Sequence, residues 1–216
     1  PGFYGSKLVD PNTDKIIWMN FKNALFNSKS LVLPGLGFED AAELKPKGIL
    51  KSIPIIPYLY TKDIYGEFLD YLYESLGRKI TIVEFSYDWR LDISKSAHEL
   101  NSLVQKIHTL GAKSVSIVAH SMGGLVTNYF LRYGGQELEG AQENWSGHKL
   151  IKQVVIAATP FKGTISIFKD TFAGIKFGLN TSLLSNESFS SFPSTYQLMG
   201  NFNLYYKNSI INYFQF

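Results

Sequence analysis

Hydrophobic residues follow two different spacings along this chain, and these spacings predict helices and strands in turn. Apolar positions three and four residues apart indicate one helix that Asp63 can cap and Gly77 ends, and a second that Ser94 can cap and Gly111 ends. A third helical pattern runs to about Tyr133. Short apolar runs predict strands at 30–35, 80–85, 115–120 and 150–158. Because helices and apolar strands alternate, we expect an α/β fold with a mostly parallel sheet and helices on both faces.

The pattern is weaker toward the two ends of the chain. Residues 1–8 look like a loop whose preceding strand is missing, and residues 16–26 have roughly helical apolar spacing. Three prolines predict irregular backbone over 45–60 (Pro46, Pro54 and Pro57). Residues 160–216 are rich in Phe, Ser and Asn without a clear period, which favours a lid or cap slightly over a loose chain end. The prediction is one α/β domain over 1–216, incomplete at both ends, with an irregular insertion at 9–60 and a lid or cap at 160–216.

Ser121 stands where a predicted strand meets a predicted helix. It lies in Ala119-His-Ser-Met-Gly123, which has the G-x-S-x-G pattern of a nucleophile elbow with Ala in place of the first Gly. Small residues are needed there because a serine in this tight turn adopts a strained backbone. The alternative is a helix N-cap, in which the hydroxyl accepts an amide hydrogen bond. The strand before Ser121 and the helix after it favour the nucleophile, placed at the carboxyl edge of the sheet.

Composition narrows the class of protein. A chain of 216 residues with 45% hydrophobic and 18% charged residues is ordinary for a globular domain. The net charge of +3 is compatible with an anionic membrane surface, whereas the lack of a Lys/Arg block argues against nucleic acid. With no cysteine, disulfides and thiolate catalysis are excluded. No spacing typical of metal ligands is visible, and no apolar run approaches the roughly 18 residues of a membrane span. Because the chain begins at Pro1 without Met, we expect its natural beginning to be missing.

Five separated motifs resemble one known family. They are Pro1-Gly-Phe-Tyr-Gly-Ser-Lys-Leu8, Tyr87-Asp-Trp-Arg-Leu91, Ala119-His-Ser-Met-Gly-Gly124, Ala158-Thr-Pro-Phe-Lys-Gly-Thr164 and Phe192-Pro-Ser-Thr-Tyr-Gln-Leu198. In this order they resemble the lecithin:cholesterol acyltransferase family, which includes lysosomal phospholipase A and phospholipid:diacylglycerol acyltransferase. The resemblance implies an α/β-hydrolase fold and a Ser-Asp-His triad. It also implies that the serine takes an acyl group from a lipid ester and passes it to an alcohol or water, without a cofactor or metal.

On this resemblance, Ser121 takes the nucleophile position, and the backbone amide of Met122 is one donor of the oxyanion hole, as elbow geometry also predicts. The family's second donor corresponds to the amide of Phe3. Sequence logic alone favours Leu36 instead, because Leu33-Pro-Gly-Leu36 follows a predicted strand. Each donor is worth about 2.7–4 kcal/mol of transition-state stabilisation in typical serine enzymes.

The rest of the triad departs from the family pattern. An acid and then a histidine follow the nucleophile in α/β-hydrolases, but here the only downstream histidine is His148 and the only downstream aspartate is Asp170, with no histidine after Asp170. We expect none of the four histidines to be the base (His98, His108, His120 and His148). The triad Asp and His are expected C-terminal to this chain, which should be crippled as a catalyst by itself.

Several roles stay open at this point. Asp88 and Arg90 are interpreted as a structural ion pair in preference to a direct functional role, and Trp89 as a packing residue. Four phenylalanines could line an acyl-chain groove or the core side of a cap helix (Phe161, Phe168, Phe172 and Phe177). The leading hypothesis is a lipid O-acyltransferase or phospholipase A-type esterase. The alternatives are a neutral-lipid carboxylesterase and an inactive lipid-binding relative.

Overall fold

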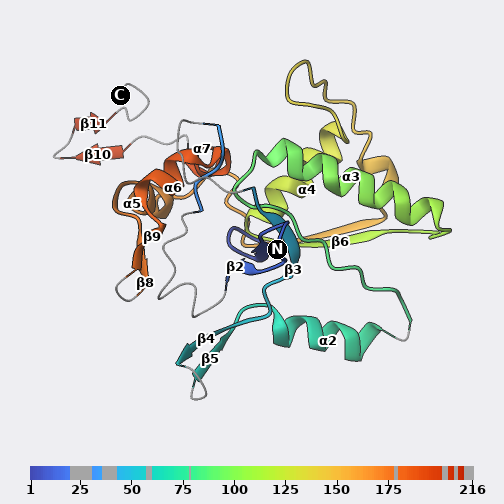
Figure 1. Ribbon diagram of the computed structural model, residues 1–216. Helices are drawn as coiled ribbons and strands as arrows, with labels where there is room; N and C mark the ends of the chain where they lie inside the picture. Colours follow the sequence, from blue (N-terminus) through green and yellow to red (C-terminus); the bar gives the residue numbers. More distant parts are fainter. Residues whose placement is uncertain are drawn as a thin grey trace.

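The structure is a computed structural model that describes residues 1–19, 31–35, 43–56, 60–77, 79–177, 180–200, 204–206 and 209–211 (Figure 1). Its helices are α2 (Gly66–Leu76), α3 (Ile93–Thr109), α4 (Met122–Tyr133), α5 (Ser166–Ala173), α6 (Asn186–Ser191) and α7 (Pro193–Leu198), with a 3-10 turn, η1, at His148–Leu150. Its strands are β1 (Ser6–Val9), β2 (Ile16–Trp18), β3 (Lys45–Ile49), β4 (Ser52–Ile56), β5 (Tyr60–Asp63), β6 (Ser116–His120), β7 (Gln153–Ala157), β8 (Ile175–Phe177), β9 (Asn180–Leu184), β10 (Leu204–Tyr206) and β11 (Ser209–Ile211).

A β–α–β unit forms the part of the fold that carries Ser121. Strands β6 and β7 pair in parallel from Ser116↔Gln153 to His120↔Ala157, and α4 makes the crossover between them. Helix α3 packs beside α4, as Figure 1 shows. Buried residues on the facing sides of the two helices form part of the core (Leu100, Val104, Val126 and Phe130). The strand, helix and strand predicted around position 121 are confirmed.

The mostly parallel sheet expected from the sequence is not what the described residues form. Only β6 and β7 pair in parallel there, whereas β2-β1-β3, β4-β5, β8-β9 and β10-β11 are small antiparallel sheets. The strands predicted at 30–35 and 80–85 are wrong where the structure describes them: 31–33 and 81–85 are not strands, although the Leu31 amide donates to the Leu183 carbonyl of β9 at 3.3 Å. A local apolar run can favour extended backbone, but a strand also needs a neighbour, and local pattern does not specify one.

Two further expectations near the N-terminus are corrected. Residues 16–18 are strand β2, which pairs with β1 after a turn, and not the start of a helix; 20–26 lie outside the described residues. Strands β3 and β4 run through Pro46 and Pro54 where the prolines predicted irregular backbone. Both are edge strands, where a proline with no N–H to donate is tolerated.

The C-terminal ends of the helices follow the local signals, whereas the predicted caps differ. Helix α2 ends at the predicted Gly77, and Gly111 follows α3 with φ +95°. The N-cap residue of α2 is Tyr65 and not Asp63, although the Asp63 carboxylate accepts from the Glu67 amide at 3.2 Å. The cap of α3 differs from the prediction, because Asp92 and not Ser94 is the N-cap residue, and its carboxylate accepts from the Ser94 amide at 2.7 Å. Within the described ranges, no helix has the length and apolar character needed to cross a membrane.

Trp89 lies at the centre of an aromatic cluster that joins distant parts of the chain. Its side chain has no exposed surface. Ring centroids lie 5.0 Å away for Phe3, 4.9 Å for Tyr4, 5.4 Å for Trp18 and 5.7 Å for Phe192. All four pairs meet edge to face, the arrangement that aromatic quadrupoles favour. The N-terminal segment, the 87–91 loop and the region before α7 therefore share one core.

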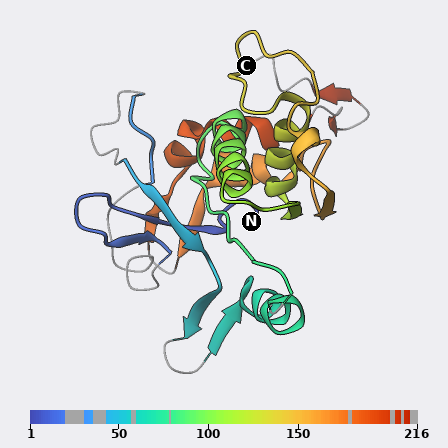
Figure 2. The same cartoon turned by 90° about the vertical axis from the view of Figure 1, so that its right-hand side faces the viewer.

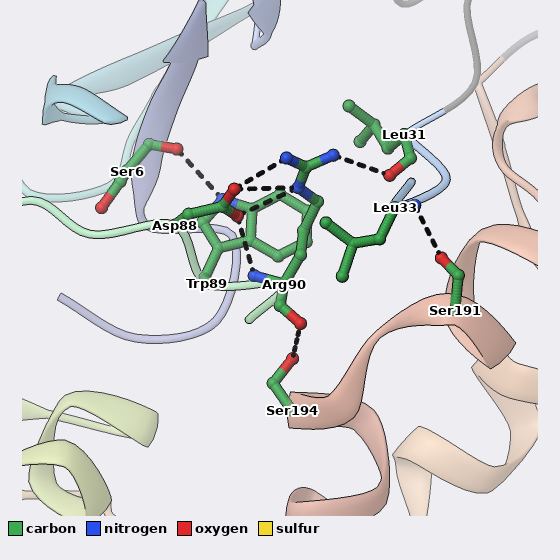
Figure 3. Close-up of polar contacts among 8 residues, drawn as sticks. All are labelled: Ser6, Leu31, Leu33, Asp88, Trp89, Arg90, Ser191 and Ser194. Atoms are coloured by element: carbon green, nitrogen blue, oxygen red, sulfur yellow. Dashed lines mark hydrogen bonds and ion pairs between the residues drawn. The ribbon is translucent and has the colours of Figure 1, made fainter. Parts of the chain in front are cut away.

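Beside Trp89, a buried ion pair links three segments of the chain (Figure 3). Arg90 Nη2 donates to the carboxylate of Asp88 at 2.7 Å, and Arg90 Nη1 donates to the Leu31 carbonyl at 2.9 Å. Ser194, in α7, donates its hydroxyl to the Arg90 carbonyl at 3.2 Å. Arg90 and Asp88 are only 1% and 4% exposed. The predicted ion pair is confirmed, and Arg90 links the 87–91 loop to the 31–35 segment through its guanidinium and to α7 through its backbone carbonyl.

We predict that Arg90→Ala lowers the free energy of unfolding by about 3–5 kcal/mol, because it leaves Asp88 buried without its partner. Urea denaturation measures the change. The control is Lys47→Ala, which removes a surface ion pair with Asp14 and should cost at most about 1 kcal/mol. Equal losses in the two variants would contradict the structural role given to Arg90.

Candidate active site

Ser121 has the backbone of a strained turn between β6 and α4. Its φ is 53° and its ψ is −127°, outside the regions that residues other than glycine normally adopt. The Ser121 amide donates to the Ala157 carbonyl at 2.9 Å, and the Gly124 amide donates to the Ser121 carbonyl at 2.9 Å. Although Ser121 occupies the N-cap position of α4, its side chain makes no capping hydrogen bond. The N-cap interpretation of the hydroxyl is therefore wrong.

The neighbours of Ser121 are small because other backbone lies against them. A Cβ added at Gly123 would overlap the Pro1 carbonyl oxygen, and one at Gly124 would overlap Thr159 Oγ1. Thr159 uses this contact to hold the turn, since its hydroxyl donates to the Ser121 carbonyl at 2.8 Å. Ala119 is 4% exposed, which leaves little space for a larger residue. Steric crowding on both sides thus explains the pattern of the elbow.

The N-terminal loop reaches the elbow at Gly2. A Cβ added at Gly2 would lie 2.7 Å from Ser121 Cβ and 3.1 Å from Ser121 Oγ. The loop then turns at once: the Gly5 amide donates to the Gly2 carbonyl at 3.0 Å, and Tyr4 has φ 66°, as at the third position of a type II turn. Phe3 is the second residue of this turn, so its peptide directly follows the backbone that contacts Ser121.

The structure describes Met122 and most of the predicted phenylalanines, but not Leu36. Met122 is the first residue of α4 and is 1% exposed. Leu36 lies outside the described residues. Phe168 packs partly buried against the core, whereas Phe161 and Phe172 are 57% and 79% exposed; the side chain of Phe177 is outside the described part.

Two tyrosines hold the N-terminal loop, and sequence analysis did not identify this role for either of them. Tyr65 Oη accepts from the Gly2 amide at 2.8 Å and lies 2.7 Å from His120 Nδ1. Tyr87 Oη donates to the Pro1 carbonyl at 2.7 Å. Burial raises the pKa of Tyr65 and lowers the pKa of His120, so a protonated phenol and a neutral imidazole are favoured at neutral pH. Tyr87 begins a motif that the sequence singled out, whereas no local signal points to Tyr65.

The remaining histidines are not hydrogen-bonded to Ser121. His98 Nδ1 lies 2.8 Å from the Gly135 carbonyl, and His108 Nε2 lies 2.9 Å from the Leu150 carbonyl. His148 packs against the Trp145 ring. Burial raises the pKa of Asp170, in α5. No group of three or more potential metal-ligating side chains occurs among the described residues.

Comparisons with known proteins agree on one family. A family model described as lecithin:cholesterol acyltransferase matches residues 38–207, which include Ser121 but not Phe3. An uncharacterized protein of Saccharomyces cerevisiae is 32% identical over 133 residues, 61% of this chain and 20% of that protein. The phospholipid–sterol O-acyltransferase of Arabidopsis thaliana is 31% identical over 150 residues, 63% of this chain and 23% of that enzyme. The chain thus spans about a quarter or less of the length of these two relatives.

A solved structure shares the fold. In the crystal structure of the Tle4-Tli4 complex, one chain superposes with a TM-score of 0.54 and 12% sequence identity. The match covers 93% of this chain and 53% of that one. At this identity the likeness concerns the fold alone.

We predict that Gly124→Ala destabilises the protein, although replacing Gly by Ala at a helical position ordinarily stabilises by up to about 1 kcal/mol. The added methyl group overlaps Thr159, and relieving such overlap typically costs about 1–3 kcal/mol. Thermal unfolding gives the sign of the change. Ser102→Ala, at an exposed position of α3, is the control and should raise stability slightly. A more stable Gly124→Ala variant would show that the close contact is absent.

Proposed function

This chain belongs to the lecithin:cholesterol acyltransferase family, for which an α/β-hydrolase fold is expected, and from this premise we propose that it takes acyl groups from lipid esters through Ser121. The observation that carries the proposal is the backbone of Ser121, with φ 53° and ψ −127° between a strand and a helix. Holding a serine in this conformation costs about 1–3 kcal/mol, and such strain concentrates at functional sites. The Ser121 hydroxyl makes no capping hydrogen bond to α4, so it is available to act as a nucleophile.

In the proposed reaction, Ser121 Oγ attacks the carbonyl carbon of the ester and gives its proton to a base. The carbonyl oxygen becomes an oxyanion in a tetrahedral intermediate. When the intermediate collapses, the bond to the leaving alcohol breaks, and that alcohol takes the proton. The acyl group is then an ester of Ser121, and an acceptor alcohol or water removes it by the same steps.

Two backbone amides are proposed to stabilise the oxyanion. The amide of Met122 opens α4, and the first amides of a helix have no partner within it and lie at the positive end of its dipole. The amide of Phe3 is the second donor, because the preceding residue, Gly2, already contacts Ser121. Each donor contributes about 2.7–4 kcal/mol. Leu36 remains the alternative to Phe3.

The base is proposed to be none of the histidines that hold other groups. His98 and His108 lie at hydrogen-bonding distance from backbone carbonyls, and His120 Nδ1 lies at that distance from Tyr65. A general base needs a ring nitrogen within reach of the serine hydroxyl, either directly or through one water. The functional tests below therefore use the natural protein in its full length.

Acceptor choice separates the activities that the family includes. Water and a lipid alcohol compete for the same acyl-enzyme, so the balance depends on how well the region around it excludes water. We propose a lipid O-acyltransferase or a phospholipase A-type esterase. A neutral-lipid carboxylesterase is the alternative.

We predict that a fluorophosphonate probe labels the natural protein at Ser121 and that Ser121→Ala abolishes the labelling. Fluorescent detection followed by peptide mapping measures it. Ser116→Ala, at an exposed position of β6, is the matched control and should label like the parent. Labelling that persists in Ser121→Ala would refute the assignment of the nucleophile.

We also expect the protein to release acyl chains from a phospholipid supplied with a long-chain alcohol. Chromatography that separates fatty ester from free fatty acid gives the acceptor: ester identifies a transferase, and fatty acid alone identifies a phospholipase. Ser121→Ala should form neither product. Release from a neutral lipid but not from phospholipid would replace this proposal with the carboxylesterase alternative.

A further inference from the structure

Helix α2 and the β4–β5 hairpin lie apart from the layer of α3 and α4 in both Figure 1 and Figure 2. The first turn of α2 nevertheless reaches the candidate active site through one side chain, that of Tyr65. Tyr65 is the N-cap residue of α2, but its side chain makes no capping hydrogen bond to the helix. It points instead to the N-terminal loop and the elbow, where it contacts Gly2 and His120.

The backbone fixes Tyr65 firmly in this place. One carbonyl, that of Lys51, accepts from the amides of Ile64, Tyr65 and Gly66 at 2.8, 3.0 and 3.0 Å. The preceding residue, Leu50, donates its amide to the Gly5 carbonyl at 2.9 Å, at the end of the turn that contains Phe3. Leu50 and Lys51, which are adjacent in the sequence, therefore hold the Phe3 turn and the start of α2, respectively.

The direction of the hydrogen bonds at Tyr65 follows from the groups involved. The Gly2 amide can only donate, so Tyr65 Oη accepts from it at 2.8 Å. Tyr65 keeps its own phenol proton, which it can donate to His120 Nδ1 at 2.7 Å. This direction corresponds to a neutral His120 with its proton on Nε2, which is the arrangement that we adopt. The result is a chain of hydrogen bonds from Gly2, which precedes Phe3, to His120, which precedes Ser121.

We propose that Tyr65 is a positioning residue that sets the distance between the Phe3 amide and the Ser121 hydroxyl. This inference rests on the proposed function of both groups. Tyr65 does not touch the reacting atoms; it ties together the two residues that precede them. Tyr87 holds Pro1 by a separate hydrogen bond, so the loop is fixed on both sides of the Gly2 amide.

The hydrogen bond of Tyr65 affects the geometry of the site more than the stability of the fold. A Cβ added at Gly2 would lie 2.7 Å from Ser121 Cβ, so the two residues are packed closely; this packing limits their approach but does not prevent Gly2 from moving away. The hydrogen bond from the Gly2 amide to Tyr65 holds Gly2 beside the elbow, whereas the bond to the Pro1 carbonyl holds its neighbour and the bond from the Gly5 amide lies within the loop itself. Because a misplacement of about 1 Å can cost roughly 100-fold in rate, a small shift of the Phe3 amide is sufficient to slow acylation.

The test is Tyr65→Phe in the natural full-length protein, with Tyr71→Phe as the matched control because Tyr71 lies on α2 and is 64% exposed. We expect kcat for acyl release from phospholipid to fall about 10–100-fold with KM unchanged, less than or equal to the loss of a complete oxyanion donor. The control should match the parent. The ¹⁵N spectrum of His120 should also change, since Nδ1 loses its donor and the preference for the Nε2–H tautomer relaxes.

A second pair of variants tests the other end of the chain of hydrogen bonds. His120→Asn places an amide oxygen near the position of Nδ1 and should retain more of the parent's kcat than His120→Leu, which fills the space without an acceptor atom. A Leu variant as active as the Asn variant would contradict the positioning role, because a packing role depends on volume and not on an acceptor atom. This comparison stays informative if Tyr65→Phe folds poorly.

The outcomes separate this inference from the proposed function. If the fluorophosphonate probe fails to label the parent, the proposed function is wrong and the positioning role fails with it. If the parent labels but Tyr65→Phe keeps the same kcat and the same His120 spectrum, the nucleophile stands and the role of Tyr65 is overturned. An increase in KM at constant kcat would also overturn it, since that result indicates substrate binding.

Discussion

The backbone of Ser121 is held in a left-handed conformation by other backbone that packs closely around it, and the rest of the site depends on this crowding. The Pro1 carbonyl lies over Gly123, Thr159 lies against Gly124, and Gly2 lies against Ser121 itself. None of the three glycines has space for a Cβ. Strain of about 1–3 kcal/mol at one residue persists only where the surroundings fix that residue from several sides. Here the strand, the helix and the N-terminal loop each supply one side.

Burial farther from Ser121 makes this arrangement rigid. Trp89 packs against Phe3 and Tyr4 in the loop, and Arg90 connects the 87–91 loop to Leu31 through its guanidinium and to Ser194 of α7 through its backbone carbonyl. The Asp88–Arg90 pair itself lies within one loop, and a buried ion pair contributes little net stability because desolvation offsets most of the attraction. Its value here is that Asp88 holds the Arg90 guanidinium in the geometry that reaches the Leu31 carbonyl. The Tyr87-Asp-Trp-Arg-Leu91 motif thus serves the site through packing and hydrogen bonds.

Sequence reasoning succeeded where one stretch of chain contains the whole cause. The elbow is such a case, because its strand, its small residues and its helix are contiguous, and Gly77 ends α2 for equally local reasons. It failed where a partner is far away. The run at 80–85 looks like a strand but has no neighbour to pair with where the structure describes it, and Pro46 lies in a strand because β3 is at a sheet edge. Tyr65 is hydrogen-bonded to Gly2, 63 residues away in the sequence, and to His120, 55 residues away. No local sequence pattern specifies contacts between residues so far apart.

If Ser121 is the nucleophile of a lipid-acting member of this family, the strained serine forms a covalent acyl intermediate during the reaction. Rapid acid quenching of the natural protein during reaction with a phospholipid of defined acyl chain, followed by peptide mass spectrometry, tests it directly. We expect one acyl group, of the mass of that chain, on the peptide that contains Ser121. An acyl group on a different residue, or product formation in a protein whose Ser121 peptide is never acylated, would contradict it.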